Sequence, residues 1–143
     1  MMNEQDKWDF INKLDEELLK GGVMLSEWST FLIRDADVAF ASGANLAALL
    51  TSLAGVESHL KYEYGESKRE RLVDLIDKAP IESDLSQDLH RLRKYRNKWV
   101  HVDEPSQDEH LLSNPEENEQ ELETMATLAI KSLRRTIYTE QCI

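Results

Sequence analysis

The sequence predicts an all-α fold, an antiparallel bundle of five or six helices that forms one domain over residues 1–143. Apolar residues recur at spacings of three and four along most of the chain, which is typical of helices with one buried face. The chain has only five Gly and three Pro, placed mostly between the periodic segments, so it offers little turn chemistry for hairpins. A length of 143 residues with 41% hydrophobic residues suits one core and is too short for two ordinary domains.

Four helices are predicted in the first eighty residues, at about 3–20, 26–41, 44–64 and 69–78. Gly21-Gly22 separates the first two, either as a break or as a kink, while Gly65 ends the third and Pro80 closes the fourth. The apolar stripes that define these helices are Trp8, Ile11, Leu14 and Leu18; Trp28, Leu32, Ala36 and Ala39 or Phe40; Leu46, Leu49, Leu53, Val56, Leu60 and Tyr64; and Leu72, Leu75 and Ile76. The third stripe is the longest, so its helix is the best candidate for the centre of the core.

Two more helices are predicted after Pro80. The first begins at Ser83 or Asp84 and runs to about residue 101. Its narrow stripe consists of Leu85, Leu89, Leu92, Arg96 and Trp99. The second lies at about 116–138. Its predicted buried face consists of Leu122, Met125, Leu128 or Ala129, Leu133 and Ile137. The acidic, turn-rich segment 103–115 between them is predicted to be a loop.

Several features bear on the cellular compartment. No apolar run approaches the ~20 residues that a membrane span needs, so no membrane association is expected. Residues 3–9 are polar and acidic, which is unlike a secretory leader. The single cysteine, Cys142, excludes an intramolecular disulfide and is compatible with a reducing compartment. The working prediction is a cytoplasmic protein.

The stretch RLRKYRNKWVH, residues 91–101, differs in charge from the rest of the chain. The chain has 28 acidic and 17 basic residues and a formal charge of −11. From His90 to His101, however, there are five Lys or Arg, two His and no acid. Because positive charge is concentrated here against a negative background, the sequence predicts that an anionic ligand binds at this helix.

Arg96 and His101 are the residues of this stretch whose positions need an explanation. Arg96 continues the apolar stripe, where a guanidinium is costly unless it faces an anion or a polar cleft. It either serves a ligand, or pairs with an acid such as Glu57 or Glu63, or extends to the surface. His101 at the predicted helix end is either a proton-transfer group or simply a cation favoured by the helix dipole.

The segment LRKYRNKWVH, in which Arg96-Asn97 is followed after three residues by His101, resembles the Arg-Asn-x-x-x-His signature of HEPN domains. These domains are small all-helical bundles that carry the motif on a late helix, as is predicted here. Glu57-x-x-x-Lys61 also looks like the acidic and basic pair that some HEPN groups carry on an earlier helix, although such an ion pair is common on any helix.

The resemblance implies a metal-independent endoribonuclease with a toxin or phage-defence role. His101 would act as general base or acid when a ribose 2′-hydroxyl attacks the adjacent phosphate and leaves a cyclic phosphate. Arg96 would stabilise the negative charge on the pentacoordinate phosphorus, and Asn97 would orient the phosphate or the His. The remaining candidates, which would contact RNA or support the site, are Arg93, Lys94, Lys98, Glu57 and Lys61.

The same resemblance implies a homodimer with two copies of the motif at the interface, RNA as the substrate, and an antitoxin protein as a further candidate partner. No cofactor is expected. The four His show no metal-ligand spacing, so no metal site is predicted. In family members silenced by a nucleotidyltransferase, a Tyr that receives the nucleotide follows the His after one intervening residue. That position is Asp103 here, so silencing by this route is not expected.

Two other functions fit the sequence. One is a non-catalytic HEPN-like module that dimerises, binds a nucleotide or RNA, or acts as an adaptor, with Arg96 in a structural role. The other is a structural bundle unrelated to the family. The charge of −11 opposes indiscriminate RNA binding, because a polyanion is repelled at long range, but it leaves room for a small basic cleft.

Overall fold

The computed structural model describes residues 1–101 and 109–143, with the side chains of residues 109 and 110 left out. The described residues form helices and contain no strand, which confirms the all-α prediction. The helices are α1 (Glu4–Leu18), α2 (Glu27–Ala41), α3 (Asn45–Tyr64), α4 (Leu72–Lys78), α5 (Ser83–Val100), α6 (Glu109–Ser113) and α7 (Pro115–Ile137). Each predicted helix is present with its ends within about one turn of the expected positions. Helix α6, however, lies in the segment that was predicted to be a loop, and that prediction was wrong for these five residues.

Local hydrogen bonds explain where the first helices begin. Asn3 and Asp6 form a capping box, in which each side chain accepts a hydrogen bond from the other residue's backbone N–H. At the start of α2 the Ser26 hydroxyl accepts from the backbone N–H of Ser29. The turn between α2 and α3 contains Gly43 with a φ of 88°, a conformation that side-chain-bearing residues rarely adopt.

Gly21-Gly22 is a true break between α1 and α2 rather than a kink. Gly22 exchanges two backbone hydrogen bonds with Cys142, at 2.8 and 2.7 Å, so the end of the chain pairs with this connection. A side chain at Gly21 would collide with the backbone of Cys142. The glycines therefore permit a close approach of two backbone segments that are far apart in the sequence.

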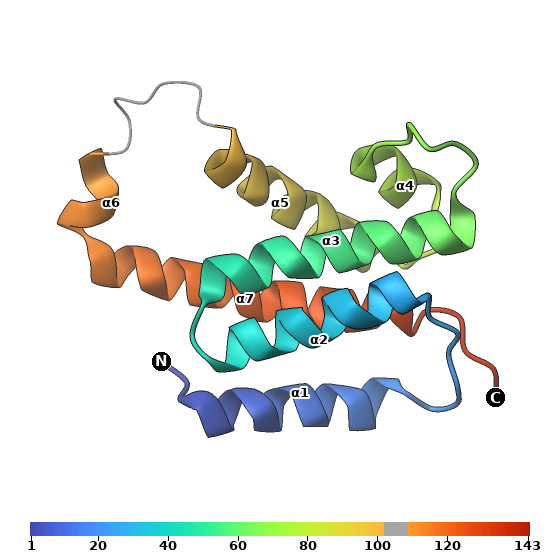
Figure 1. The fold of residues 1–143 in the computed structure, drawn as a ribbon, viewed down its shortest axis with the longest axis horizontal. Coiled ribbons are helices and arrows are strands. Elements are labelled where there is room, and N and C mark those ends of the chain that lie inside the picture. Colours follow the sequence, from blue (N-terminus) through green and yellow to red (C-terminus); the bar gives the residue numbers. More distant parts are fainter. Residues whose placement is uncertain (102–108) are drawn as a thin grey trace.

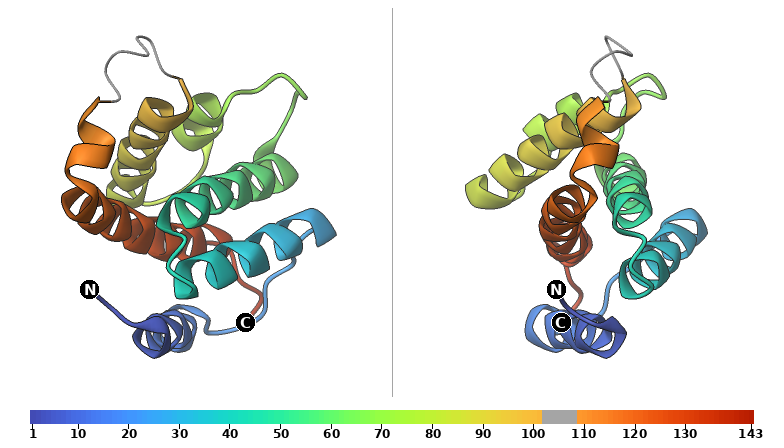
Figure 2. Two further views of the ribbon diagram at one scale, coloured as in Figure 1. Left: turned by 60° about the vertical axis from the view of Figure 1, so that its left-hand side comes forward. Right: turned by 90° about the vertical axis from the view of Figure 1, so that its left-hand side faces the viewer.

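Helices α3 and α7 form the centre of the bundle. α7 contacts α1, α2, α3, α5 and α6, and α3 contacts α2, α4, α5 and α7. The five long helices alternate in direction along the chain (Figure 1). Both views in Figure 2 place α1 and α5 on opposite sides of the central pair. Helix α5 thus has one face on the core and another open to solvent.

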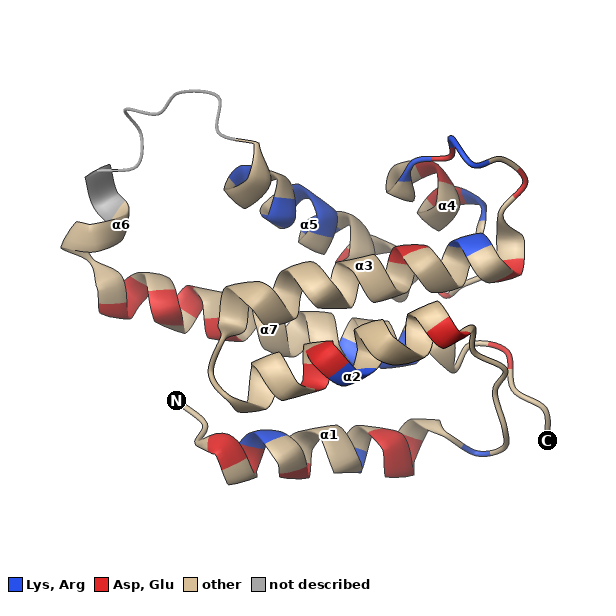
Figure 3. Cartoon of the chain, viewed as in Figure 1, with Lys and Arg blue, Asp and Glu red and all other residues tan. Residues whose placement is uncertain are grey.

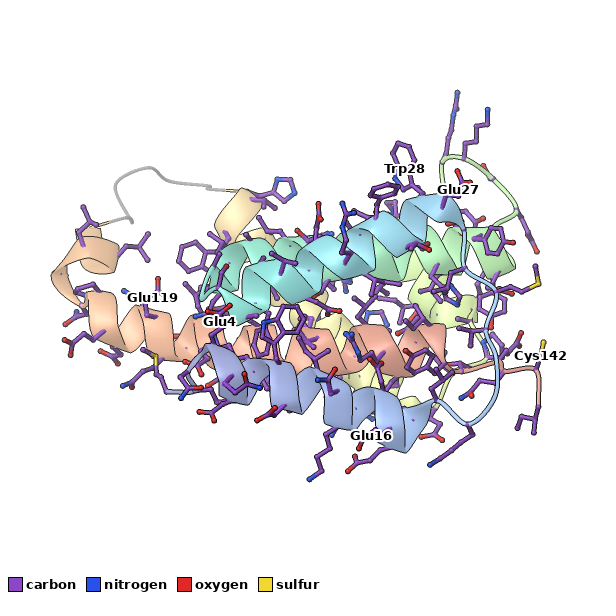
Figure 4. The ribbon with its side chains drawn as sticks, turned by 60° about the horizontal axis from the view of Figure 1, so that its bottom comes forward. Glu4, Glu16, Glu27, Trp28, Glu119 and Cys142 are labelled. Atoms are coloured by element: carbon purple, nitrogen blue, oxygen red, sulfur yellow. The ribbon has the colours of Figure 1, made fainter. Side chains whose placement is uncertain are left out.

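The predicted stripes supply most of the core, with one exception. Their buried members include Ile11, Phe40, Leu49, Leu53, Leu60, Leu75, Leu89 and Leu133. Trp28 was predicted to face inward on α2, but it is 76% exposed and points away from the bundle (Figure 4). The buried residues of α2 are instead Ser29, Ala36, Phe40 and Ala41, and Ser29 forms a 3.0 Å hydrogen bond to Ser58 of α3. The stripe of α2 is therefore displaced from the predicted one at its first turn.

A buried ion-pair network joins α7 to α1 and α2. The guanidinium of Arg134, which is 3% exposed, donates two hydrogen bonds to Asp37, at 2.8 and 2.6 Å, and one to Asp15, at 2.9 Å. Tyr138 also donates to Asp15, at 2.7 Å. Because the buried charge has two carboxylate partners in good geometry, this arrangement holds three helices in register.

Candidate functional site

The candidate site lies on the last turns of α5, beyond the part of the helix that packs on the core. Leu85, Leu89 and Leu92 are buried and fix the first turns. The positive residues that follow form the cluster seen on α5 in Figure 3, whereas α1 and the start of α7 are rich in acidic residues. We call residues 91–101 the cationic segment. It is presented on a helix that the core holds in place.

Arg96 is half-buried, and its guanidinium forms no ion pair with any acid that the structure describes. Its Nη2 donates to the side-chain oxygen of Asn97 at 3.2 Å, while its Nε is buried and has no hydrogen-bond partner. Within the described ranges, no carboxylate oxygen lies within 4.0 Å of its nitrogens, so the structure does not show the pairing with Glu57 or Glu63 that was one explanation of its position. Among the described residues, therefore, Arg96 has no anionic partner for its guanidinium.

Asn97 connects the two other motif residues. Its side-chain oxygen accepts from Arg96, and its backbone carbonyl accepts from the N–H of His101 at 2.9 Å. His101 is the C-cap of α5, and its side chain is exposed, without a hydrogen bond or ion pair to any residue that the structure describes. The motif residues are thus gathered at one helix end, with a half-buried cation and an exposed imidazole.

The three predicted RNA-contacting residues have different surroundings. Lys94 is exposed and has no carboxylate partner among the described residues. Arg93 contacts the Nδ1 of His90 through its Nη2 at 3.3 Å. Lys98 pairs with Glu121 of α7 at 3.6 Å and lies over the Tyr95 ring at 5.1 Å. Lys94 and Arg93 are thus available to an anion, whereas Lys98 already has an anionic partner.

The predicted supporting pair lies on α3. Lys61 and Glu57 approach to 4.0 Å as an i, i+4 ion pair on a partly exposed surface. Among the described residues, neither forms a hydrogen bond or an ion pair with Arg96, Asn97 or His101. The structure therefore brings the motif residues together without this pair.

Two polar arrangements near the site or in the core could not be found from sequence spacing. His90, the residue directly before the cationic segment, contacts Asp77 of α4 with its Nε2 at 2.8 Å. The Arg134 network joins residues that are about 100 or more positions apart in the chain. Neither has a local motif, because the partners meet only after the helices pack. The described residues hold no group of three or more His, Cys, Asp and Glu suited to a metal ion.

Asp103, the residue that departs from the family pattern, lies outside the residues that the structure describes. In the described ranges, no helix is both long and apolar enough to cross a membrane. No family model matches this chain, and neither a curated protein nor a solved structure is similar enough to count as a match.

Proposed function

We propose that the protein is a metal-independent endoribonuclease of the HEPN type. The observation that carries this proposal is Arg96, a half-buried guanidinium whose Nε has no hydrogen-bond partner and which has no carboxylate within 4.0 Å among the residues that the structure describes. The same guanidinium is hydrogen-bonded to Asn97, whose carbonyl caps the helix end that carries His101. A cation and an exposed imidazole at one helix end suit the binding and cleavage of a phosphodiester.

The chemistry needs a proton carrier and a donor for developing negative charge. His101 would take the proton of a ribose 2′-hydroxyl as O2′ forms its bond to phosphorus. The bond from phosphorus to O5′ then breaks, O5′ takes a proton from water, and a 2′,3′-cyclic phosphate remains. His101 returns the proton that it accepted to the solvent. Arg96 would donate to the phosphoryl oxygens while their charge increases. Donors of this kind are typically worth a factor of ~10²–10³, and positioned acid–base catalysis a factor of ~10²–10⁴.

A homodimer in which two cationic segments meet around one RNA is part of this proposal. Two such segments would repel each other without an anion between them, so RNA would stabilise their approach. Light scattering at micromolar concentration should give the mass of two chains. A monomer both with and without RNA would contradict the dimer.

Uncontrolled cleavage of cellular RNA would harm the host cell. We therefore include in the proposal a role as a toxin or in phage defence, with an antitoxin protein as the partner that controls it.

The test is an incubation of the full chain with single-stranded and structured RNAs in EDTA. The expected products carry a 5′-hydroxyl on one fragment and a cyclic phosphate on the other. Cleavage that EDTA abolishes, or products with other ends, would contradict the proposed chemistry.

A non-catalytic RNA-binding module is the second candidate, and one observation favours it. The His101 side chain has no partner among the described residues to fix its tautomer, whereas a catalytic His is commonly oriented by a second group. RNA that is bound and released intact by the full chain would support this second function.

A further inference from the structure

The contact between α4 and α5 contains a histidine that the proposed reaction does not use. His90 lies between two charged residues: its Nε2 is 2.8 Å from Oδ1 of Asp77, and its Nδ1 is 3.3 Å from Nη2 of Arg93. Asp77 belongs to α4, while His90 and Arg93 are one turn apart on α5. The three side chains form a continuous chain of contacts from an exposed carboxylate to a guanidinium.

Hydrogen-bond chemistry assigns the direction of these contacts. A guanidinium has donors only, so the Nδ1 of His90 must accept from Arg93. The proton of the neutral imidazole is then on Nε2 and is donated to Asp77. Asp77 therefore selects the tautomer of His90 that can hold Arg93.

Arg93 keeps unused donors in this position. Its Nε is buried without a hydrogen-bond partner, and no carboxylate lies within 4.0 Å of its guanidinium among the described residues. Arg93, Asn97 and His101 follow one another at intervals of four, so each is rotated by only about 40° from the one before. Arg93 and His101 are thus about 80° apart around α5 and about 12 Å apart along the helix axis.

We propose that Arg93, held by Asp77 and His90, forms a second phosphate-binding site, which takes a phosphodiester of the same RNA strand at a nucleotide away from the one that is cleaved. Arg93 is the residue that contacts the phosphate, and Asp77 and His90 are positioning residues. This inference rests on the proposed function for the identity of its ligand. It adds a site and two residues that the Arg-Asn-x-x-x-His pattern does not contain.

The direction in which Asp77→Ala changes RNA affinity distinguishes a positioning role of Asp77 from a general effect of its charge. Removing an acid from a negatively charged protein normally favours RNA binding or leaves it unchanged, because repulsion decreases. Asp77→Ala should instead weaken RNA binding, because Arg93 loses its fixed position. Asp74→Ala is the control, since Asp74 is also an exposed acid of α4 and pairs with Arg71 at 3.3 Å, with no hydrogen bond or ion pair to His90 among the described residues.

The experiment measures the Kd of a fluorescent single-stranded RNA oligonucleotide by anisotropy in EDTA, with His101→Ala in every protein to prevent cleavage. In this background Arg93→Ala should raise the Kd about tenfold, the loss expected for a charged hydrogen-bond donor. Asp77→Ala should raise the Kd at least ~3-fold, while Asp74→Ala should leave it unchanged or lower it. The double variant Asp77→Ala/Arg93→Ala should bind no more weakly than Arg93→Ala alone, because both changes remove one interaction.

Melting curves of the same proteins check that each variant is folded at the assay temperature. The inference is overturned if Asp77→Ala behaves like Asp74→Ala, or if Arg93→Ala has no effect on the Kd; the Asp77–His90 pair then only ties α4 to α5. Cleavage by the otherwise unchanged chain is measured separately. If the protein cleaves RNA but Asp77→Ala does not change the Kd, the second phosphate site is refuted alone. If the protein binds RNA without cleaving it, the ribonuclease function is refuted alone. A protein that binds no RNA refutes both proposals.

Discussion

Arg96 is the residue whose surroundings most restrict the function. A half-buried cation normally lowers stability unless an anion lies beside it. The described residues place no carboxylate within 4.0 Å of the Arg96 guanidinium. We predict that Arg96→Met, which keeps the length of the side chain without the charge, leaves the free energy of unfolding unchanged or raises it by about 1 kcal/mol. Urea denaturation provides the measurement.

A structural Arg96 would give the opposite result. In that case Arg96→Met would lower the free energy of unfolding by several kcal/mol, as is seen when a buried ion pair loses one partner. Leu92→Ala on the same helix is the reference for a structural change, because Leu92 is fully buried and its truncation should cost about 2–5 kcal/mol.

His59 gives the protein an acid-sensitive residue in the core. Burial lowers the pKa of this imidazole from 6.5, although Glu63 and Glu140 act in the opposite direction, and its Nδ1 is buried without a partner. The unfolded chain therefore binds a proton at a pH where the folded chain does not. The contribution of His59 to stability is complete above pH 6.5 and decreases as the pH falls below that value.

We accordingly predict that the free energy of unfolding decreases more between pH 7.5 and 5.5 for the wild-type protein than for the His59→Gln variant. Urea denaturation at both pH values measures the difference, and the two proteins share all other titratable groups. An equal loss in both proteins would show that another group causes the acid sensitivity.

The sequence identified the motif residues but not their surroundings. Arg96, Asn97 and His101 could be predicted to share a helix end, because their spacing and the helical period determine it. The Asp77–His90 contact could not, since it joins residues 13 positions apart on two helices whose packing angle the sequence does not specify. The same limit explains why the suggested acidic partners of Arg96 are not found in contact with it.

At the scale of elements, α7 organises the bundle through Arg134. We predict that Arg134→Ala lowers the free energy of unfolding by about 3–5 kcal/mol, because Asp37 and Asp15 would remain close together and partly buried without their cation. Thermal or urea denaturation followed by circular dichroism measures this loss.

Arg135→Ala is the control, since it removes the same side chain from the neighbouring position. Arg135 pairs with Glu82 and Asp84, which are exposed to solvent, so the loss should be about 1 kcal/mol or less. Equal losses in the two variants would contradict the central role given to the buried network.

The helices themselves were largely predictable, and the exceptions have physical reasons. Capping residues, glycines and prolines mark the ends of the long helices, and their apolar stripes mark the buried faces. Helix α6 is only five residues long, too short to show a periodic stripe. Trp28 was misplaced because it fits the spacing of its stripe, yet it lies in the first turn of α2, where Ser29 packs towards α3 instead.

At the scale of the whole molecule, the −11 charge and the cationic segment have opposite effects on RNA. Of the residues proposed to contact RNA, Arg93, Lys94 and Arg96 have no carboxylate partner among the described residues. Single-stranded RNA releases about 0.7 counterion for each phosphate contact, so three contacts predict a slope of about −2 for log K against log salt concentration. Salt also screens the repulsion from the rest of the chain, which makes the slope shallower.

We therefore predict a slope between 0 and about −2 over 50–200 mM salt, measured by anisotropy with His101→Ala protein. Arg96→Ala in that background should make the slope shallower by about 0.7. A slope much steeper than −2 would indicate an extended RNA-binding surface and would contradict a small local site.

The central claim is that Arg96 and His101 perform RNA cleavage, and the most direct measurement is the cleavage rate in EDTA for the unchanged chain, Arg96→Ala, His101→Ala and Arg69→Ala. Arg69 is an exposed arginine without a carboxylate partner among the described residues, so it controls for the loss of a positive charge. We predict that Arg96→Ala and His101→Ala lower the rate by ~10²-fold or more with nearly unchanged melting temperatures, and that Arg69→Ala stays within about twofold of the unchanged chain. The claim would be contradicted if the wild-type protein cleaved none of a diverse set of RNAs. It would also be contradicted if Arg69→Ala lowered the cleavage rate as much as Arg96→Ala does.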